Sequence, residues 1–514
     1  MNSYKDCADF IGKIEKKFPV NEWKIEDLDL WPYIRTELAY FFSSKQSGVS
    51  KTKLRSKKRS SSETSWFFLR NQKRRLTAFF YAIKRKDLNL FLTVGSNPFF
   101  SEKKDVVYLA QASTVVELNK KWYNIFFDPI NELLRKKGMK SLAFEFPNGV
   151  GIKEPKWFNS YLDLKKVLDA EPFIRNYFTE PLPVKLSNYA KFISYLDDSV
   201  GEFPESLLRN NIELTANRLY YTSLFFQAIL KQLSPRIIIL TCYYFDLGFA
   251  LCHAAQKSGI KTIDMQHGVL ESWPAYSNWT VIPASGYSTL PDVFWTWTAS
   301  DAEYINRWAI KTSKHKAFDY GNTWFLSWKN ETSRIYGVLN LPYDLFNEYT
   351  KHYSRIILFT GQPFPGEPPI PEYLIQTCGI SPGDWLWLIR IHPSQTDQIA
   401  QVKKAFNMEK PLENVIINDA TLLPLPFILK YVSIHITAES AAVIDAASMG
   451  IPSLITSNKG TELFRGYLAE GLVTYCPPFS ETIVKAISNL QSEKEVIAEQ
   501  KERSLEFVLN LLNL

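Results

Sequence analysis

Cysteine is scarce in this chain. Only five of its 514 residues are cysteines, they are scattered, and no two of them stand in a Cys-x-x-Cys spacing. Disulfide-stabilised domains and structural zinc sites both require several closely spaced cysteines. The sequence therefore argues against a disulfide framework and against a zinc site, and it suits a reducing cytoplasm.

Long apolar segments are also missing. The first residues, MNSYKDCADFIGKIEKK, contain no apolar core of the kind that a secretory signal peptide has. No segment reaches the roughly 18 uncharged apolar residues that a transmembrane helix requires. The nearest one runs from Ile237 to Cys252, and Asp246 interrupts it. We therefore expect a cytoplasmic protein rather than a secreted or integral membrane protein.

Several motifs that mark well-known catalytic sites are absent. The chain has no GxxxxGK[ST] phosphate loop, no GxGxxG after a predicted strand and no HExxH metal motif. No Asp-x-Asp pair stands at a predicted strand end, where it would hold a metal ion on a nucleotide sugar. We therefore expect chemistry that requires neither a metal ion nor a cofactor.

The chain is rich in residues that build a folded core. Hydrophobic residues make up 46% of it and aromatic residues 15%, which excludes a wholly disordered chain. Its length is sufficient for two or three domains. The net charge of +7 is modest for this size. It is compatible with phosphate ligands or anionic lipids, and it identifies neither.

The first 100 residues are predicted to form a helical, basic region. Residues 25–42 carry apolar side chains at helix-like intervals. The densest positive charge runs from Lys51 to Lys86, where arginines and lysines alternate with aromatic residues. Such a segment can lie on an anionic membrane surface. The alternative is a solvated loop followed by a helix that packs on the main body. Nucleic acid is a poorer explanation, because no nucleic-acid-binding motif accompanies the charge.

Strands and helices alternate from about residue 105. Strands are predicted at 105–110, an apolar run, at 236–240, a β-branched run, and at 261–265 and 294–298. A helix is predicted at 247–258, between two of these strands, and such a strand-helix-strand unit implies a parallel sheet. After the last of the four strands we expect another helix, with Ser300 and Asp301 at its cap.

The same alternation restarts after a looser stretch at 321–353. Further strands are predicted at 355–360, 385–391, 432–437 and 452–456. The predicted fold class is therefore α/β, with two Rossmann-like domains that face a cleft. We place these domains at 101–345 and 346–514, after the basic region at 1–100. In parallel sheets of this kind, ligands bind at the carboxyl ends of the strands.

The first candidate site is the segment IRIHPSQ. His392 directly follows a predicted strand, and Pro393 stops that strand and fixes the turn. An imidazole at this position can donate a hydrogen bond to a phosphate, or protonate it as a nucleotide leaves. The alternative is a histidine that caps the strand end by bonding a backbone carbonyl. A single His-Pro dipeptide does not decide between the two.

The second candidate site is the segment ITAESAAVIDAASMGIPSLI. A strand is predicted to end at Thr437, a helix to begin at Ser440, and Gly450 to close that helix. A helix N-terminus attracts phosphate through its free N–H groups and its dipole, and the Ser440 hydroxyl would add to this anion site. Asp445 stands five residues later and could reach a ribose hydroxyl. The alternative is an ordinary strand-helix-strand unit with Ser440 as the helix cap.

The two segments together resemble a known group of enzymes. In order and spacing they are similar to bacterial GT-B glycosyltransferases that build capsule and O-antigen polysaccharides. These include capsule-synthesis Kdo transferases, sialyltransferases with a His-Pro motif, and CDP-glycerol transferases. The resemblance covers roughly residues 105–480. It implies that His392 and Ser440 contact the donor phosphate and that Asp445 contacts the ribose. With Pro393 and Gly450, these residues form the predicted donor site.

A third candidate site, TIDMQHGVLES, belongs to the first domain. His267 follows a predicted strand beside Asp264, and Gly268 permits a tight turn. A histidine there could remove a proton from an acceptor hydroxyl, because its reference pKa is near neutral. The Gln-His-Gly element resembles that of surface-polysaccharide transferases. It departs from the acidic motif of sialyltransferases, in which a carboxylate is the base. The alternative is a buried His267 that bonds the backbone.

Asp246 is the last candidate. It follows the strand predicted at 236–240 and could act as a carboxylate nucleophile in a transferase that retains configuration. The alternative is that Asp246 caps the helix that begins at Leu247. The sequence alone favours the interpretation that Asp246 caps the helix.

The cysteine pattern and the absence of a signal or membrane segment predict a cytoplasmic protein, and the basic segment from Lys51 to Lys86 allows it to be peripheral at the inner face of the plasma membrane. The resemblance implies an enzyme. Its substrates would be a CMP- or UDP-linked sugar donor and a polysaccharide or lipid-linked saccharide acceptor. Helix dipole, His392 and Ser440 would neutralise the leaving phosphate without a metal ion. One alternative is a nucleotide-sugar epimerase of the 2-epimerase type, which leaves the basic N-terminal segment unexplained. The other is a non-catalytic polysaccharide assembly protein, against which the intact His267, His392 and Ser440 count.

Overall fold

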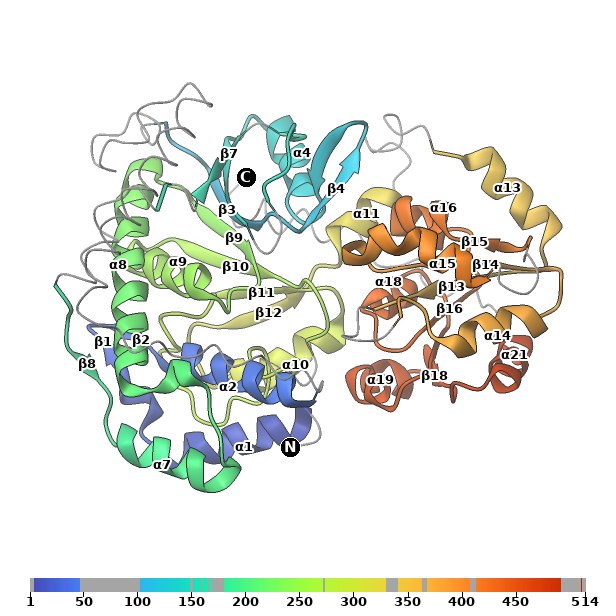
Figure 1. Cartoon of the computed structure of the whole chain (residues 1–514). Coiled ribbons are helices and arrows are strands. Elements are labelled where there is room, and N and C mark those ends of the chain that lie inside the picture. Colours follow the sequence, from blue (N-terminus) through green and yellow to red (C-terminus); the bar gives the residue numbers. More distant parts are fainter. Residues whose placement is uncertain are drawn as a thin grey trace, which may run out of the picture. The chain divides into compact units, whose positions relative to one another are not determined.

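The computed structural model of the chain (Figure 1) describes residues 4–46, 102–147, 151–158, 160–164, 167–168, 180–270, 273–329, 341–362, 368–406, 413–490 and 510. These residues form two compact units that divide between Thr323 and Trp324. Each unit is built on its own parallel sheet. The segment from Lys51 to Lys86, and the domain boundary predicted near residue 100, lie outside the described residues.

The chain begins with two helices that enclose a short hairpin. The elements are α1 (Tyr4–Lys17), the 3-10 turn η1 (Val20–Glu22), β1 (Lys24–Ile25), β2 (Leu28–Asp29) and α2 (Trp31–Gln46). The prediction of a helix over residues 25–42 is therefore wrong in its first part. Glu26 adopts a left-handed φ of 50° that turns β1 into β2, and Pro32 at the start of α2 suits a first helical turn.

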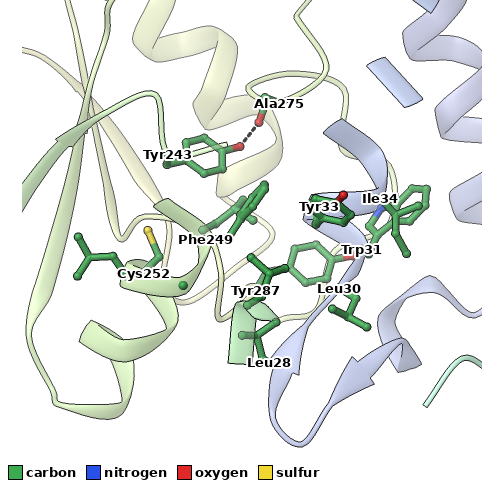
Figure 2. Close-up of a cluster of buried hydrophobic side chains, with 14 of the residues drawn as sticks. Leu28, Leu30, Trp31, Tyr33, Ile34, Tyr243, Phe249, Cys252, Ala275 and Tyr287 are labelled. Carbon is green, nitrogen blue, oxygen red and sulfur yellow. Dashed lines mark hydrogen bonds between the residues drawn. The ribbon is translucent and has the colours of Figure 1, made fainter. Parts of the chain in front are cut away.

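These N-terminal helices are part of the core of the first unit. Arg35 of α2 forms an ion pair with Glu15 of α1, and both side chains are fully buried. The Arg35 guanidinium also stacks on Trp279 at 4.2 Å and donates to the Pro274 carbonyl at 2.9 Å. Figure 2 shows the apolar cluster beside it, in which Tyr33 lies against Phe249 with ring centroids 6.2 Å apart. The N-terminal residues therefore help to build the first unit.

The first unit contains a seven-stranded parallel sheet in the order β12-β11-β10-β9-β3-β6-β7. Counted along the chain, its first six strands have the order 3-2-1-4-5-6 of a Rossmann sheet, and β12 extends one edge. The strands are β3 (Val106–Gln111), β6 (Ser141–Phe146), β7 (Tyr161–Asp163), β9 (Ile237–Thr241), β10 (Lys261–Met265), β11 (Val293–Thr296) and β12 (Lys316–Asp319). The prediction of a Rossmann-like domain here is confirmed.

Helices and two small strand pairings complete the first unit. They are the hairpin β4 (Val115–Leu118) and β5 (Lys121–Asn124), β8 (Val184–Lys185), which pairs with β1, α4 (Asp128–Lys136), α7 (Tyr189–Val200), η5 (Glu205–Leu207), α8 (Arg209–Leu233), α9 (Asp246–Lys257) and α10 (Ala299–Ala309). Helices α8 and α9 pack against each other (Figure 1). The cap of α10 is Thr298, whose hydroxyl accepts from the Asp301 N–H at 3.1 Å. The predicted cap at Ser300 and Asp301 was therefore two residues late.

The second unit contains a six-stranded parallel sheet in the order β15-β14-β13-β16-β17-β18. This is again the Rossmann order 3-2-1-4-5-6. The strands are β13 (Arg355–Thr360), β14 (Trp385–Arg390), β15 (Val415–Ile416), β16 (Ile434–Thr437), β17 (Ser453–Ile455) and β18 (Val473–Tyr475). The second predicted Rossmann-like domain is thus confirmed, and the strands predicted at 261–265 and 355–360 are found with the same bounds.

Short helices precede, connect and follow the strands of the second unit. They are α11 (Thr323–Lys329), α13 (Tyr343–His352), α14 (Glu372–Ile380), η6 (Pro393–Gln398), α15 (Ile399–Phe406), α16 (Asn418–Leu422), α17 (Leu425–Leu429), α18 (Ala442–Ser448), α19 (Asn458–Leu463), α20 (Arg465–Ala469) and α21 (Ser480–Asn489). Strands β13, β14 and β16 are apolar and buried on both faces, as parallel strands covered by helices require. Within the described part of the chain, no helix is long and apolar enough to cross a bilayer.

Candidate functional site

The strand order indicates where each sheet would bind a ligand. In a Rossmann sheet the order reverses beside the first strand, and loops leave that point in opposite directions. In the second unit this point lies between β13 and β16, and in the first unit between β3 and β9. The predicted donor residues His392 and Ser440 follow β14 and β16, the two neighbours of β13. Both therefore lie at the carboxyl edge beside the switch point.

His392 lies in the turn between β14 and η6. The strand ends at Arg390, and the N–H of Gln395 donates to the His392 carbonyl at 2.8 Å. This hydrogen bond closes a tight turn that begins directly after the strand. The side chain is half-buried, and burial lowers the pKa of His392 below its usual value. Its imidazole is therefore mainly neutral at pH 7 and can donate one hydrogen bond.

Ser440 lies in the loop after β16, two residues before α18 begins. Its N–H donates to the Thr437 hydroxyl at 3.2 Å, and its own hydroxyl accepts from the Ala442 N–H at 3.3 Å. The helix was predicted to begin at Ser440, and it begins at Ala442. The Ser440 hydroxyl thus stands at the amino end of α18 and covers one of its free N–H groups.

The loop that carries Ser440 is held from the following segment. Ser457 donates to the Ala438 carbonyl at 3.2 Å and to Glu439 at 3.2 Å, and it accepts from the Gly460 N–H at 2.9 Å. A Cβ at Gly460 would come within 2.3 Å of the Ala438 carbonyl oxygen, so only glycine fits there. This packing fixes the backbone on which Ser440 is presented.

Asp445 and Arg390 are two ionisable residues near this edge whose pKa values are shifted by burial. The Asp445 carboxylate accepts no hydrogen bond from any described residue. Burial raises the pKa of Asp445 to about 7, although the positive charge of Arg390 acts against this shift. The guanidinium of Arg390 donates through Nη1 to the carbonyls of Ala420 and Leu423, at 2.7 Å each. Burial lowers the pKa of Arg390 to about 10.

The remaining nitrogens of Arg390 are available for a ligand. Nε and Nη2 donate to none of the described residues, and no ion pair within 4 Å joins Arg390 to Asp445. An arginine with one nitrogen anchored and two unused can present a fixed pair of donors to a phosphate. Sequence reasoning missed Arg390, although it stands two residues before His392 in the same IRIHP segment.

Gly450 lies at the other end of α18. It follows the helix at a left-handed φ of 71°, and its N–H donates to the Ala447 carbonyl at 3.0 Å. A residue in this conformation ends a helix, and glycine adopts it without steric cost. Because β17 begins soon after, Gly450 lies near the amino edge of the sheet, whereas Ser440 lies near the carboxyl edge.

The candidate site of the first unit contains a fully satisfied buried acid. Asp264, on β10, is 1% exposed. One of its oxygens accepts from the Tyr243 N–H at 3.0 Å and the other from the Tyr276 hydroxyl at 2.7 Å. Burial raises the pKa of Asp264 to about 8. The side chain ties the end of β10 to the loop after β9 and to the segment that contains Tyr276.

Gln266 shapes the turn that presents His267. Its amide nitrogen donates to the Gly268 carbonyl at 3.0 Å and to Asp301 at 3.1 Å. Its carbonyl oxygen accepts from the Trp297 N–H at 2.7 Å. The buried amide therefore joins the ends of β10 and β11 to the start of α10, which explains the glutamine of the Gln-His-Gly element.

His267 lies among aromatic rings at the carboxyl edge. Its Nε2 lies 3.2 Å from the Tyr244 hydroxyl, and its ring centroid lies 6.4 Å from that of Tyr276. Burial lowers the pKa of His267 to about 4, while the Met265 backbone carbonyl acts in the opposite direction. The imidazole is therefore neutral at pH 7, the form that can accept a proton, but it is a weaker base than the near-neutral reference pKa suggested.

Asp246 is the first residue of α9, and no side chain caps that helix. Its carboxylate forms an ion pair with Arg218 of α8, at 2.5 Å. His267 and Asp246 thus follow the adjacent strands β10 and β9. In the part of the chain that the structure describes, no group of three His, Cys, Asp or Glu side chains is placed to hold a metal ion.

Comparisons with known proteins give a likeness in structure only. No family model matches the sequence, and no curated protein matches it. One similar structure is the UDP-GlcNAc 2-epimerase of Methanocaldococcus jannaschii, with 12% identity, 80% of this chain and 99% of that chain covered, and a TM-score of 0.45. Another is the MurG of Acinetobacter baumannii, with 10% identity, 80% of this chain and 99% of that chain covered, and a TM-score of 0.41. The fold assignment rests on the strand orders of the two sheets.

Proposed function

We propose that the chain is a glycosyltransferase of the GT-B type. In this proposal the second unit holds a nucleotide-sugar donor and the first unit activates the acceptor, a surface polysaccharide or a lipid-linked saccharide. The observation that carries it is the group of unused polar atoms at the carboxyl edge of the second sheet. The Asp445 carboxylate and two nitrogens of Arg390 make no hydrogen bond within the described chain. A nucleotide that binds at a switch point needs hydrogen-bond partners there, and these atoms could serve as such partners.

The donor phosphate would meet three kinds of hydrogen-bond donor. Arg390 supplies a permanent positive charge, His392 a neutral imidazole N–H, and Ser440 a hydroxyl in the loop before α18. Such preorganised donors stabilise the charge that develops on a leaving phosphate. Pro393 fixes the turn after β14, and Gly450 ends α18; both act by shaping the backbone.

Asp445 would hold the ribose. Its carboxylate is half-buried, lacks an internal hydrogen-bond donor and lies in the field of Arg390. A ribose presents two hydroxyl donors, and a carboxylate can accept from both. Ribose binding would therefore satisfy an acceptor that the folded chain leaves unused.

On the acceptor side, His267 would be the general base. Its neutral imidazole takes the proton of the acceptor hydroxyl while the new bond forms at the sugar carbon and the bond to the donor phosphate breaks. Tyr244 would orient the ring through the hydroxyl that lies 3.2 Å from Nε2. Asp264 has both oxygens engaged inside the protein, so its contribution would be to position this edge. Asp246 would be the nucleophile in the alternative mechanism, in which the transferase retains the configuration of the sugar.

The experiment that tests this function separates it from its two rivals. The full chain is first screened by thermal shift against UDP, CMP, GDP and CDP, because a ligand bound only to the native state raises the melting temperature. The matching nucleotide sugars are then incubated with and without saccharide acceptors. Transfer to an acceptor supports the proposal. Isomerised donor without acceptor indicates an epimerase, and inert donors indicate a non-catalytic assembly protein.

Membrane contact through the segment from Lys51 to Lys86 stays a separate proposal. The segment combines many cations with aromatic residues, a composition that anionic lipid surfaces attract. Binding to anionic vesicles that weakens as salt rises, and that is lost when the segment is deleted, would support it. Binding that ignores both lipid charge and salt would contradict it.

A further inference from the structure

A basic groove lies on the first unit, between α1 and the end of α10. Its volume is about 680 Å³, within the range that small ligands occupy. One wall is formed by α1 and the other by α10 and the turn after it, while Asn278, Trp279 and Thr280 contribute the floor. None of the predicted donor or acceptor residues lines this groove.

The two walls bring four cations together. Lys13 and Lys16 line the α1 side, and Arg307 and Lys311 line the α10 side. Within the described residues the three lysines form no ion pair, and Arg307 has only an exposed partner, Glu303, at 3.4 Å. Asp9 is the single acidic residue of the lining. The groove therefore carries an excess of positive charge that the described chain does not neutralise.

The groove is held in shape by close packing beneath it. Thr280 donates to the Gly12 carbonyl at 3.3 Å, and a Cβ at Gly12 would come within 3.0 Å of the Thr280 methyl group. Glycine thus lets α1 approach the floor closely. Thr280 also donates to Glu15 at 2.6 Å, which pairs with the buried Arg35. The lysines of α1 are therefore presented from a fixed helix.

An exposed isoleucine directly precedes the groove residue Lys311 in the chain. Ile310 is 84% exposed, the highest value among the large hydrophobic side chains of the described chain. It follows the last residue of α10, and its N–H continues the helical pattern by donating to the Asn306 carbonyl at 3.1 Å. Residues three apart on a helix are neighbours, so Ile310 lies beside Arg307 and next to Lys311.

We propose that this groove binds the phosphate headgroup of an anionic lipid, with Ile310 entering the apolar layer beside it. Cations around a phosphate and an apolar side chain at the same edge are the two features that an anionic bilayer surface recognises. An acidic saccharide would use the cations and leave Ile310 in water. The site is separate from the segment between Lys51 and Lys86, and it does not depend on the proposed transfer reaction.

The test measures binding of the full chain to vesicles of equal parts phosphatidylcholine and phosphatidylglycerol. The variant Lys13→Glu, Lys16→Glu, Lys311→Glu reverses three groove charges. The matched control Lys136→Glu, Lys137→Glu, Lys191→Glu makes the same change of net charge on exposed lysines of α4, the residue after it, and α7. We expect the groove variant to bind about a hundredfold more weakly and the control to bind within about threefold of wild type.

A second arm identifies the source of the phosphate. Ile310→Ser should weaken vesicle binding about tenfold, and this loss should persist in high salt because it is apolar. Soluble glycerol 1-phosphate should bind far more weakly than the vesicles. Equal vesicle binding by the groove variant and its control would overturn the proposal. Vesicle binding by Ile310→Ser that equals that of wild type would also overturn it. Tight binding of an acidic saccharide through Lys13, Lys16 and Lys311 would do the same.

Discussion

Each unit has an acid near the carboxyl edge of its sheet, the buried Asp264 on β10 and the half-buried Asp445 on α18, and the two acids differ in their partners. Burial raises the pKa of both, to about 8 for Asp264 and about 7 for Asp445. Asp264 accepts hydrogen bonds through both oxygens from Tyr243 and Tyr276. Asp445 accepts none from the described chain. A raised pKa alone thus does not distinguish a structural acid from a binding acid, whereas the hydrogen-bond partners do.

The same distinction applies to the histidines. His435 in β16 lies 2.8 Å from the Thr360 hydroxyl and 2.9 Å from that of Ser453, so both ring nitrogens are engaged inside the sheet. His253 is likewise placed between Ser223 and Asp27, at 2.7 and 3.1 Å. Ser223 and His253 are buried in α8 and α9, whereas Asp27 is exposed in the turn between β1 and β2 and also pairs with Lys257. The arrangement joins the hairpin to the two helices, which makes it a structural network. His267 and His392 differ from these two in position, because they stand in the turns that follow β10 and β14.

The largest expected effect concerns the acceptor side. We expect His267→Ala to reduce turnover by about 10²–10⁴-fold, because a general base contributes that much, while nucleotide affinity stays nearly unchanged. His352→Ala, on an exposed helix face, is the control and should have full activity. Steady-state kinetics and nucleotide titration measure both quantities. If His267→Ala is active and Asp246→Ala is inactive with a sugar adduct detectable by mass spectrometry, a retaining reaction through Asp246 replaces this account.

The next largest effect is expected on stability, from substitution of Asp264, the acid that we interpret as structural. Asp264→Ala leaves two buried donors without an acceptor, which costs about 2–5 kcal/mol of local stability. Asp445→Ala removes no internal hydrogen bond and removes a carboxyl whose ionised form burial disfavours, so it should not destabilise the fold. Hydrogen exchange of the peptide that contains Tyr243 measures the first, and that of the α18 peptide the second. Equal destabilisation by both substitutions would abolish the distinction drawn between the two acids.

A smaller effect is expected at Arg390. Loss of a charged donor to phosphate weakens binding by about 10–100-fold, so Arg390→Lys should reduce nucleotide affinity within that range. Arg355 is the matched control, because it also donates to two carbonyls, those of Leu490 and Ser488, but from the amino end of β13. Arg355→Lys should leave affinity unchanged. Equal losses from both substitutions would point to general destabilisation of the sheet.

The smallest effects are expected at His392 and Ser440. Each alanine substitution should weaken nucleotide binding by about three- to tenfold, since each removes one hydrogen bond. The double variant should lose less than the product of the two, because both side chains are proposed to meet the same phosphate. Calorimetric titration of the four proteins measures this coupling. Unchanged affinity in both single variants would remove these residues from the donor site.

The sequence was a good guide to the positions of strands. RIILFT and KTIDM correspond to β13 and β10 residue for residue. The first was predicted as a strand because it is mainly apolar, as a parallel strand covered on both faces requires, and the second because it follows a predicted strand and helix. The turn after β14 could also be predicted, because the proline of its His-Pro pair stops a strand. The hairpin at Lys24–Asp29 could not, since it depends on the left-handed turn at Glu26 and on pairing with distant β8.

The candidate site was predictable only in part. His392, Ser440 and His267 could be found because they directly follow strands. Arg390 could not be distinguished from a surface arginine, because the carbonyls that anchor it belong to Ala420 and Leu423, some 30 residues further along the chain. The engagement of Asp264 by Tyr276 depends likewise on tertiary packing. Local pattern gives the positions of polar groups, and the fold decides which of them are left for a ligand.

The pH dependence of nucleotide binding tests the donor site most directly. The folded pKa of Asp445 is raised to about 7, so the unliganded carboxyl is largely protonated below that pH and ionised above it. An ionised carboxylate accepts a stronger hydrogen bond from a ribose hydroxyl. We therefore predict that wild type binds its nucleotide about tenfold more tightly above pH 7 than below it, relative to Asp445→Asn titrated with the same nucleotide. Parallel profiles for the two proteins, or no binding of any nucleotide by wild type, would contradict the account.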